Sequence, residues 1–159
     1  MADEWFVLNA RDAQWRWAEG RTAVCDFEEN GEFPQLGLNV SVVQPGEFLG
    51  MYHWEADQED FLVLSGECLL LIEGEERRLR AWDFVHCPAW TEHVFVGAGD
   101  GPCAILAVGA RASRDVVYPE AEVAQKHGAG VAKATRDGKE AYAAFREDVD
   151  VPYTEGWLP

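Results

Sequence analysis

Positive charge is scarce in this chain of 159 residues, which carries 13 Lys and Arg against 29 Asp and Glu. The formal charge of −16 repels nucleic acid and anionic membrane surfaces, so we expect neither as a partner. No apolar run approaches the roughly 18 residues that a membrane-spanning helix needs. A helix-turn-helix segment is also missing, which argues against a transcriptional regulator.

Cysteine is sparse as well. The chain has four, at positions 25, 68, 87 and 103, and none of them forms a Cys-x-x-Cys pair. Most of them lie in apolar, strand-like runs, where a free thiol behaves as a small hydrophobic side chain. Residues 2–5 are acidic, unlike the basic and then apolar start of a secretory signal. We therefore expect reduced thiols and a cytoplasmic protein.

The chain is nevertheless 48% hydrophobic, which predicts a globular domain with a substantial core. Short apolar runs separated by Gly-containing turns fill residues 36–110, and no helical pattern interrupts them. The expected strands span residues 38–44, 48–55, 60–64, 68–73, 77–80, 84–87, 93–96 and 103–108. This pattern predicts an all-β, antiparallel sandwich or barrel.

The two ends of the chain have a different character, although we expect all three segments to form one domain. Residues 1–35 are irregular and rich in aromatic side chains, which predicts a flap packed on the barrel or on a partner subunit. Residues 111–159 form a tail with short helices expected at 120–127 and 139–146.

Two His and two Glu residues supply the side chains that proteins use to hold one divalent metal ion. They are His53, Glu55, Glu59 and His93. Residues two apart on a strand point the same way, so His53 and Glu55 are predicted to share a face. An unpaired carboxylate inside a barrel is very costly. Either a cation lies there or the carboxylate pKa values are strongly raised.

Apolar side chains in the same strand phase are predicted to line the pocket around these groups. Met51 shares the phase of His53, Phe61 that of Glu59, and Phe95 that of His93. Such walls around a few polar groups are what a small-molecule site needs, although ordinary barrel packing would look the same.

The spacing of these residues resembles that of the cupin family in its small, single-domain form. Its first motif ends in a His-x-His pair, a Glu and, after six intervening residues, a Gly, and His53, Glu59 and Gly66 match it. Pro88 and His93 match the second motif. The resemblance covers residues 36–110 and implies a jelly-roll barrel, or double-stranded β-helix, with a metal inside one end.

The chain also departs from the cupin motifs. Glu55 stands at the second His, Trp82 and Trp90 replace two Gly residues, and Gly97 replaces the final Asn. Trp90 is therefore predicted to border the pocket. Glu55 has three readings: a metal ligand, a general base beside the metal, or a hydrogen-bond partner of His93 in a metal-free pocket.

By resemblance, the four His and Glu residues would hold Mn, Fe or Zn, which carboxylate and imidazole both bind. Two carboxylates bring a divalent ion to net zero charge. This weakens it as a Lewis acid and makes a higher oxidation state easier to reach.

Three functions fit these features. The first is a metal-dependent enzyme with dioxygenase-like or sugar-isomerase-like chemistry on a small organic molecule. The others are a non-catalytic cupin that holds a metal or metabolite, and a metal-free barrel that uses a His and Glu pair for proton transfer. The resemblance also implies a homodimer paired through a sheet face.

Overall fold

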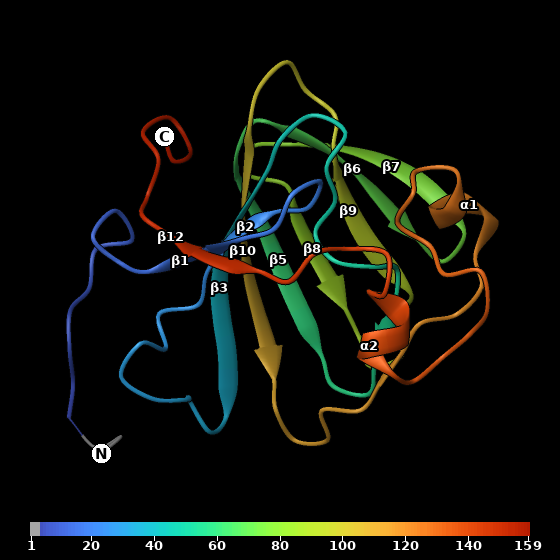
Figure 1. Ribbon diagram of the computed structural model, residues 1–159, viewed down its shortest axis with the longest axis horizontal. Helices are drawn as coiled ribbons and strands as arrows, with labels where there is room; N and C mark the ends of the chain where they lie inside the picture. Colours follow the sequence, from blue (N-terminus) through green and yellow to red (C-terminus); the bar gives the residue numbers. More distant parts are fainter. Residues whose placement is uncertain (1–3) are drawn as a thin grey trace.

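The computed structural model describes residues 4–159, and antiparallel strands dominate it (Figure 1). The strands are β1 (Trp15–Trp17), β2 (Ala23–Cys25), β3 (Leu36–Val43), β4 (Trp54–Glu55), β5 (Glu59–Ser65), β6 (Glu67–Ile72), β7 (Glu75–Arg80), β8 (Phe84–Cys87), β9 (His93–Gly97), β10 (Cys103–Ala110), β11 (Val116–Val117) and β12 (Val149–Val151). Two short helices, α1 (Glu122–Gln125) and α2 (Gly138–Ala141), follow β11. No helix between residues 4 and 159 has the length and apolar character to cross a membrane.

Three antiparallel sheets make up the fold. The largest has the strand order β12-β1-β2-β3-β10-β5-β8, the second has the order β7-β6-β9, and the third pairs β11 with β4. Central strand β10 pairs with β3 along its whole length and with β5 along most of it. The hydrogen bonds do not close into a continuous ring, but the predicted all-β jelly roll is confirmed.

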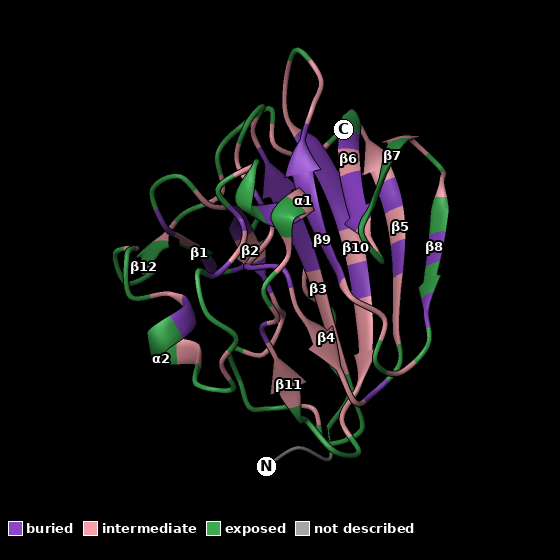
Figure 2. Ribbon diagram, turned by 90° about the vertical axis from the view of Figure 1, so that its right-hand side faces the viewer, coloured by how far each residue is buried: buried purple, intermediate pink, exposed green. Residues whose placement is uncertain are grey.

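The main core lies between the seven-stranded and the three-stranded sheets, where the purple segments of Figure 2 face one another. Alternation along the strands builds it, because Phe61 and Val63 of β5 point inward while Leu62 and Leu64 point outward. Each such side chain, fully buried, contributes about 1.5–3 kcal/mol of hydrophobic free energy.

Both ends of the chain join the large sheet. Strand β2 pairs with β3, and β1 lies between β2 and the C-terminal strand β12. Trp15 is fully buried and packs against Trp157 with 5.1 Å between ring centroids. The N-terminal segment predicted to be a flap thus contributes two strands, while its residues 1–3 lie outside the described part of the chain.

The expected strand over residues 48–55 is wrong for most of its length, because only Trp54–Glu55 forms strand β4. Two glycines before β4 adopt the left-handed backbone conformation, with φ of +83° at Gly46 and +74° at Gly50. Extended pairing cannot continue through such residues. The segment instead makes isolated bridges at Phe48 and His53.

The two expected C-terminal helices are present but shorter than predicted. Helix α1 covers four of the eight residues expected at 120–127, and α2 ends before Tyr142. The phenol oxygen of Tyr142 accepts a hydrogen bond from the backbone N–H of Met51 at 2.9 Å. This long-range contact, which local periodicity does not encode, fixes the chain at the end of α2.

Candidate metal centre

The four predicted ligands meet inside one end of the jelly roll. Glu59 begins β5, His93 begins β9, Glu55 ends β4, and His53 lies just before β4. Two adjoining cavities of about 240 and 370 Å³, called here the first and second hollow, reach this group from either side. Five residues line both hollows: Asn39, His53, Glu55, Glu59 and Ala107.

The two imidazoles are placed by a main-chain bridge. His53 N–H donates to the carbonyl of His93 at 3.2 Å, and His93 N–H donates back to the carbonyl of His53 at 2.8 Å. Residues paired this way across antiparallel segments present their side chains on the same face. The ring centroids lie 4.9 Å apart.

Each imidazole is also held in one tautomer by a carbonyl two residues earlier in the chain. His53 Nδ1 lies 2.7 Å from the carbonyl oxygen of Met51, and His93 Nδ1 lies 2.9 Å from that of Thr91. Since a carbonyl can only accept, both Nδ1 atoms carry the proton. In its neutral form each imidazole therefore presents the lone pair of Nε2 to the centre, as a metal-ligating His does.

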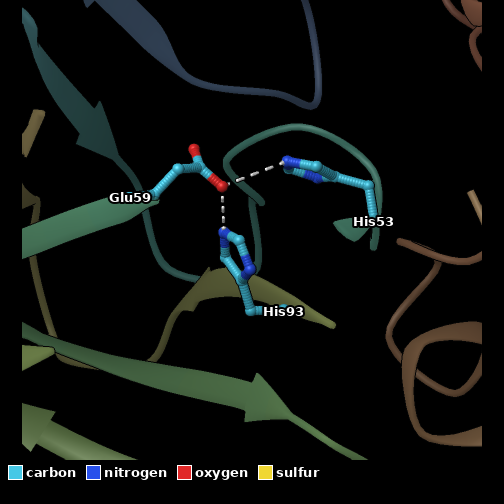
Figure 3. A group of neighbouring side chains, drawn as sticks. All are labelled: His53, Glu59 and His93. Carbon is cyan, nitrogen blue, oxygen red and sulfur yellow. Dashed lines mark ion pairs between the residues drawn. The ribbon is translucent and has the colours of Figure 1, made fainter. Parts of the chain in front are cut away.

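The Glu59 carboxylate faces the Nε2 atoms of both imidazoles (Figure 3). Its Oε2 lies 3.2 Å from His93 Nε2 and 3.9 Å from His53 Nε2. Burial alone would raise the pKa of Glu59, but the hydrogen bond with His93 and the charges of both imidazoles lower it below its ordinary value. Glu59 is therefore a carboxylate anion near neutral pH.

The opposite balance applies to His93, which is only 2% exposed. Burial would lower its pKa, yet the hydrogen bond and negative charge of Glu59 raise the pKa above its ordinary value. Below this raised pKa, and without a cation at the centre, a proton on His93 neutralises the charge of Glu59.

Glu55 lies at the edge of the group. Its Oε1 is 3.6 Å from His53 Nε2, and its side chain is 31% exposed, against 15% for Glu59. The compact set, in which all donor atoms lie within 4.8 Å of one another, consists of His53, Glu59 and His93. All four predicted residues are thus brought together, with three closely grouped and Glu55 beside them.

Of the four side chains predicted to border the pocket, Phe61 and Phe95 line the first hollow. Their ring centroids are 4.7 Å apart, and Phe61 lies 5.2 Å from the His93 ring. Met51 and Trp90 line neither hollow. Both lie elsewhere in the structure, for two separate reasons.

Met51 is buried in a different cluster, with Val131 and Ala141 of the C-terminal segment. Its prediction depended on a strand between residues 51 and 53, and none forms there. Trp90 is 63% exposed, in a turn where its φ is +66°. The backbone N–H of Trp90 donates to the carbonyl of Glu55 at 2.6 Å, which leaves the indole outside.

Cys87 lies opposite Glu59 in the β5–β8 pairing but remains outside the metal-ligating group. Burial, followed by the negative charge of Glu59, raises its pKa to about 12. The thiol thus stays protonated and packs as an apolar side chain. All four cysteines are free and buried.

Three further residues of the hollows were not predicted from the sequence: Asn39, Tyr118 and Tyr142. Burial, then the neighbouring groups Tyr142 and Glu55, raises the pKa of Tyr118 to about 12, so its hydroxyl stays protonated. Both tyrosines come from the C-terminal segment, and no sequence signal links them to the centre. Asn39 did carry a signal, because it is a polar residue in the inward phase of an apolar strand.

The donor set fits a divalent cation. Two imidazole nitrogens with free lone pairs and one ionised carboxylate converge, and a second carboxylate stands within reach. Zn, Mn and Fe all accept such nitrogen and oxygen donors. His53, Glu59 and His93 could therefore hold one divalent ion, as the sequence predicted in part.

Similarity to known proteins agrees with this geometry. A family model described as "Cupin domain" matches residues 39–109. A search of curated proteins gave no match. The chain resembles the crystal structure of a sugar phosphate isomerase of the cupin superfamily from Silicibacter pomeroyi, with 21% identity and a TM-score of 0.53, covering 87% of this chain and 83% of that one.

Two other solved structures show a similar fold over less of their length. The DMSP lyase DddQ from Ruegeria pomeroyi has 28% identity and a TM-score of 0.52, with 64% of this chain and 54% of that one covered. The polyketide cyclase RemF from Streptomyces resistomycificus has 19% identity and a TM-score of 0.50, with 58% and 66% covered. The chain thus spans less than two thirds of each. Matching motifs, strand topology and family model together identify residues 39–109 of this chain as a cupin domain.

Proposed function

We propose that this protein is a metal-dependent enzyme that moves a proton between adjacent carbon atoms of a small hydroxy-carbonyl compound. His53, Glu59 and His93 would hold the divalent ion, and Glu55 would carry the proton. One observation carries the proposal: the Glu55 carboxylate stands beside the three grouped donors, is partly exposed, and lines both hollows. A base must reach substrate while remaining free of the metal.

A bound divalent cation would supply Lewis acidity, drawing electron density from a substrate carbonyl or hydroxyl oxygen and so acidifying the neighbouring C–H bond. Glu55 then removes the proton from that carbon and returns it to the adjacent, former carbonyl carbon, while the hydroxyl proton of the first carbon moves to the former carbonyl oxygen. The net change is an isomerisation that consumes no oxygen and no other reactant. The apolar rings of Phe61 and Phe95 limit water at this place, which strengthens the electrostatic interactions there.

One of the similar structures carries the name sugar phosphate isomerase, which is compatible with this reaction. Its 21% identity extends the likeness to the fold alone. The position of Glu55 therefore supports the proposal more directly than the resemblance does.

The test is to load the protein with Mn(II), Fe(II) or Zn(II) under oxygen-free conditions and offer ketoses, aldoses, sugar phosphates, diols and catechols in deuterated water. We expect solvent deuterium on a carbon of an isomerised product. Glu55→Gln should lower turnover by about 10²–10⁴-fold and leave the bound metal per chain unchanged. Glu122→Gln is the matched control, since the Glu122 side chain is 85% exposed on α1.

Other outcomes would contradict the proposal and favour one of the remaining functions. Product formed only with oxygen would indicate a dioxygenase. Tight ligand retention without product would indicate a binding module. Activity that is indifferent to a chelator would indicate a metal-free His and Glu pair.

A further inference from the structure

Strand β3 carries two polar residues on the face that points into the jelly roll. Asn39 and Ser41 alternate in phase with Val43, which belongs to the main core. Ser41 is fully buried, and Asn39 is half-buried on the wall of both hollows. An amide in such a place is unfavourable unless its donors and acceptors find partners.

The Ser41 hydroxyl donates to Oδ1 of Asn39 at 2.8 Å. This hydrogen bond satisfies the carbonyl end of the amide and turns Nδ2 toward the hollows. Among residues 4–159, no acceptor takes a hydrogen bond from Nδ2 of Asn39. The two Nδ2 protons are thus free to donate to a molecule in the cavity.

The register places Asn39 on the same inner face of the large sheet as Glu59, two strands away. Asn39 pairs with Ala107 of β10, and Ala107 pairs with Phe61 of β5, so Asn39 and Phe61 are separated by about 9–10 Å, two strand spacings. Glu59 lies on the same strand as Phe61, opposite Gly109. On this face, β10 carries only the small residues Ala107 and Gly109, which leave the space between Asn39 and Glu59 open.

Two other donor side chains line the first hollow. The Thr22 hydroxyl donates to the carbonyl of Val42 at 2.7 Å, and Arg21 forms an ion pair with Asp148, although its buried Nε has no partner among residues 4–159. Asn39 is therefore a neutral donor whose Nδ2 has no partner among residues 4–159. It lines both hollows two strands away from Glu59.

We infer that Asn39 determines substrate specificity by donating from Nδ2 to a substrate oxygen other than the one at the metal, with Ser41 as its positioning residue. This inference rests on the proposed function and narrows its substrate to polyhydroxylated molecules, which present one oxygen to the metal-ligating group and another to Asn39. A molecule with a single polar end would leave the amide unpaired, at a cost in affinity.

The test uses unreactive, neutral polyols as probes: glycerol, erythritol and xylitol. Their binding to the Mn(II)-loaded protein is followed by water-proton relaxation, and Mn(II) affinity is measured separately. We expect at least one polyol to bind the wild type. Asn39→Asp keeps the shape and the acceptor for Ser41 but loses the donor, and Asn39→Ala loses both. Each should weaken polyol binding about tenfold, the loss of one hydrogen bond.

Ser41→Ala should weaken polyol binding less, by about threefold, because the amide stays but is no longer oriented. Asn30→Asp, at an exposed position, is the matched control and should bind as the wild type does. Mn(II) affinity should be unchanged in every variant.

Each alternative result has a definite meaning. Equal polyol affinity in the wild type and both Asn39 variants would overturn the inference and leave the proposed function standing. So would a wild type that holds Mn(II) but no polyol, or Asn39 variants that lose Mn(II). A wild type that binds no divalent metal would overturn the proposed function, and the inference with it.

Discussion

His53 and His93 exchange two main-chain hydrogen bonds, of 3.2 and 2.8 Å, so the backbone itself aligns their imidazoles. Glu59 completes the group from the opposite sheet, with its Oε2 3.2 Å from His93 Nε2. The centre thus joins the two sheets, and its members can be tested separately.

Replacing Glu59 by Gln should remove most of the metal affinity. Gln keeps the size of the side chain but removes the only charge in the compact donor set, so we expect an affinity loss of at least about 100-fold. Isothermal titration with Mn(II) and Zn(II) measures it. Asp60→Asn is the matched control, since Asp60 points to the other face of β5 and pairs with His86. Equal losses in both variants would argue against a metal at Glu59.

Replacing Glu55 by His separates a ligand from a base. If Glu55 acts as the base, Glu55→His should retain one metal per chain with little change in affinity and should lose turnover. Elemental analysis and metal titration report the first quantity, and the deuterium assay reports the second. Markedly tighter metal binding would instead place residue 55 among the ligands.

Metal binding should weaken as pH falls, beginning above the ordinary imidazole range. Glu59 raises the pKa of His93, so the metal-free protein holds a proton there to a higher pH than a free imidazole would. Below that pKa, metal must displace the proton, and the apparent affinity falls by about tenfold per pH unit. NMR titration of the metal-free protein should place the His93 midpoint above about 6.5.

The same titration in Glu59→Gln provides the control. Without the carboxylate, burial dominates, and the His93 midpoint should move down. A midpoint that is identical in both proteins would show that Glu59 does not hold the His93 proton.

Gly97→Ala should destabilise the fold by about 2 kcal/mol or more, because the added carbon has no space. A Cβ at Gly97 would lie 2.1 Å from the carbonyl oxygen of Gln44, whose segment is bridged to β9. This contact also explains why the final Asn of the cupin motif is absent here. Gly101→Ala meets nothing within 4 Å and should change stability by no more than about 1 kcal/mol. Urea unfolding measures both.

We propose that the chain pairs with a second copy through the outer face of the large sheet. Phe84 is 64% exposed on edge strand β8, opposite Leu62, which in turn lies opposite Leu106. Phe84→Lys should convert a dimer into a monomer in light-scattering chromatography, because a charge would be desolvated at the contact. Val149→Lys, on the far edge strand β12, should leave the dimer intact. A monomeric wild type would contradict the proposal.

Much of the fold could be predicted because alternation and turn residues are local signals. The expected strand at 84–87 coincides with β8, and the other main strands differ from prediction by a few residues at their ends. The segment 48–55 failed because the left-handed conformation at Gly46 and Gly50 is stabilised by distant partners, Gly97 and Tyr142 among them. Periodicity does not report such contacts.

The residues of the candidate centre also differ in how far the sequence could predict them. His53, Glu59 and His93 could be predicted from their spacing in the cupin motifs, and they form the compact donor set. The inward phase of Asn39 could be read from its strand, but its distance from Glu59 could not, because that distance depends on the β10 register. Met51 was misplaced since strand phase was applied where no strand forms.

The carbonyls of Met51 and Thr91 accept hydrogen bonds from Nδ1 of the two imidazoles, so the main chain fixes the ring orientations without a bound metal ion. Emptying and refilling the centre should therefore require no refolding. We expect one divalent metal ion to exchange for another as their concentrations change, and the reactivity of the protein to depend on which ion is bound.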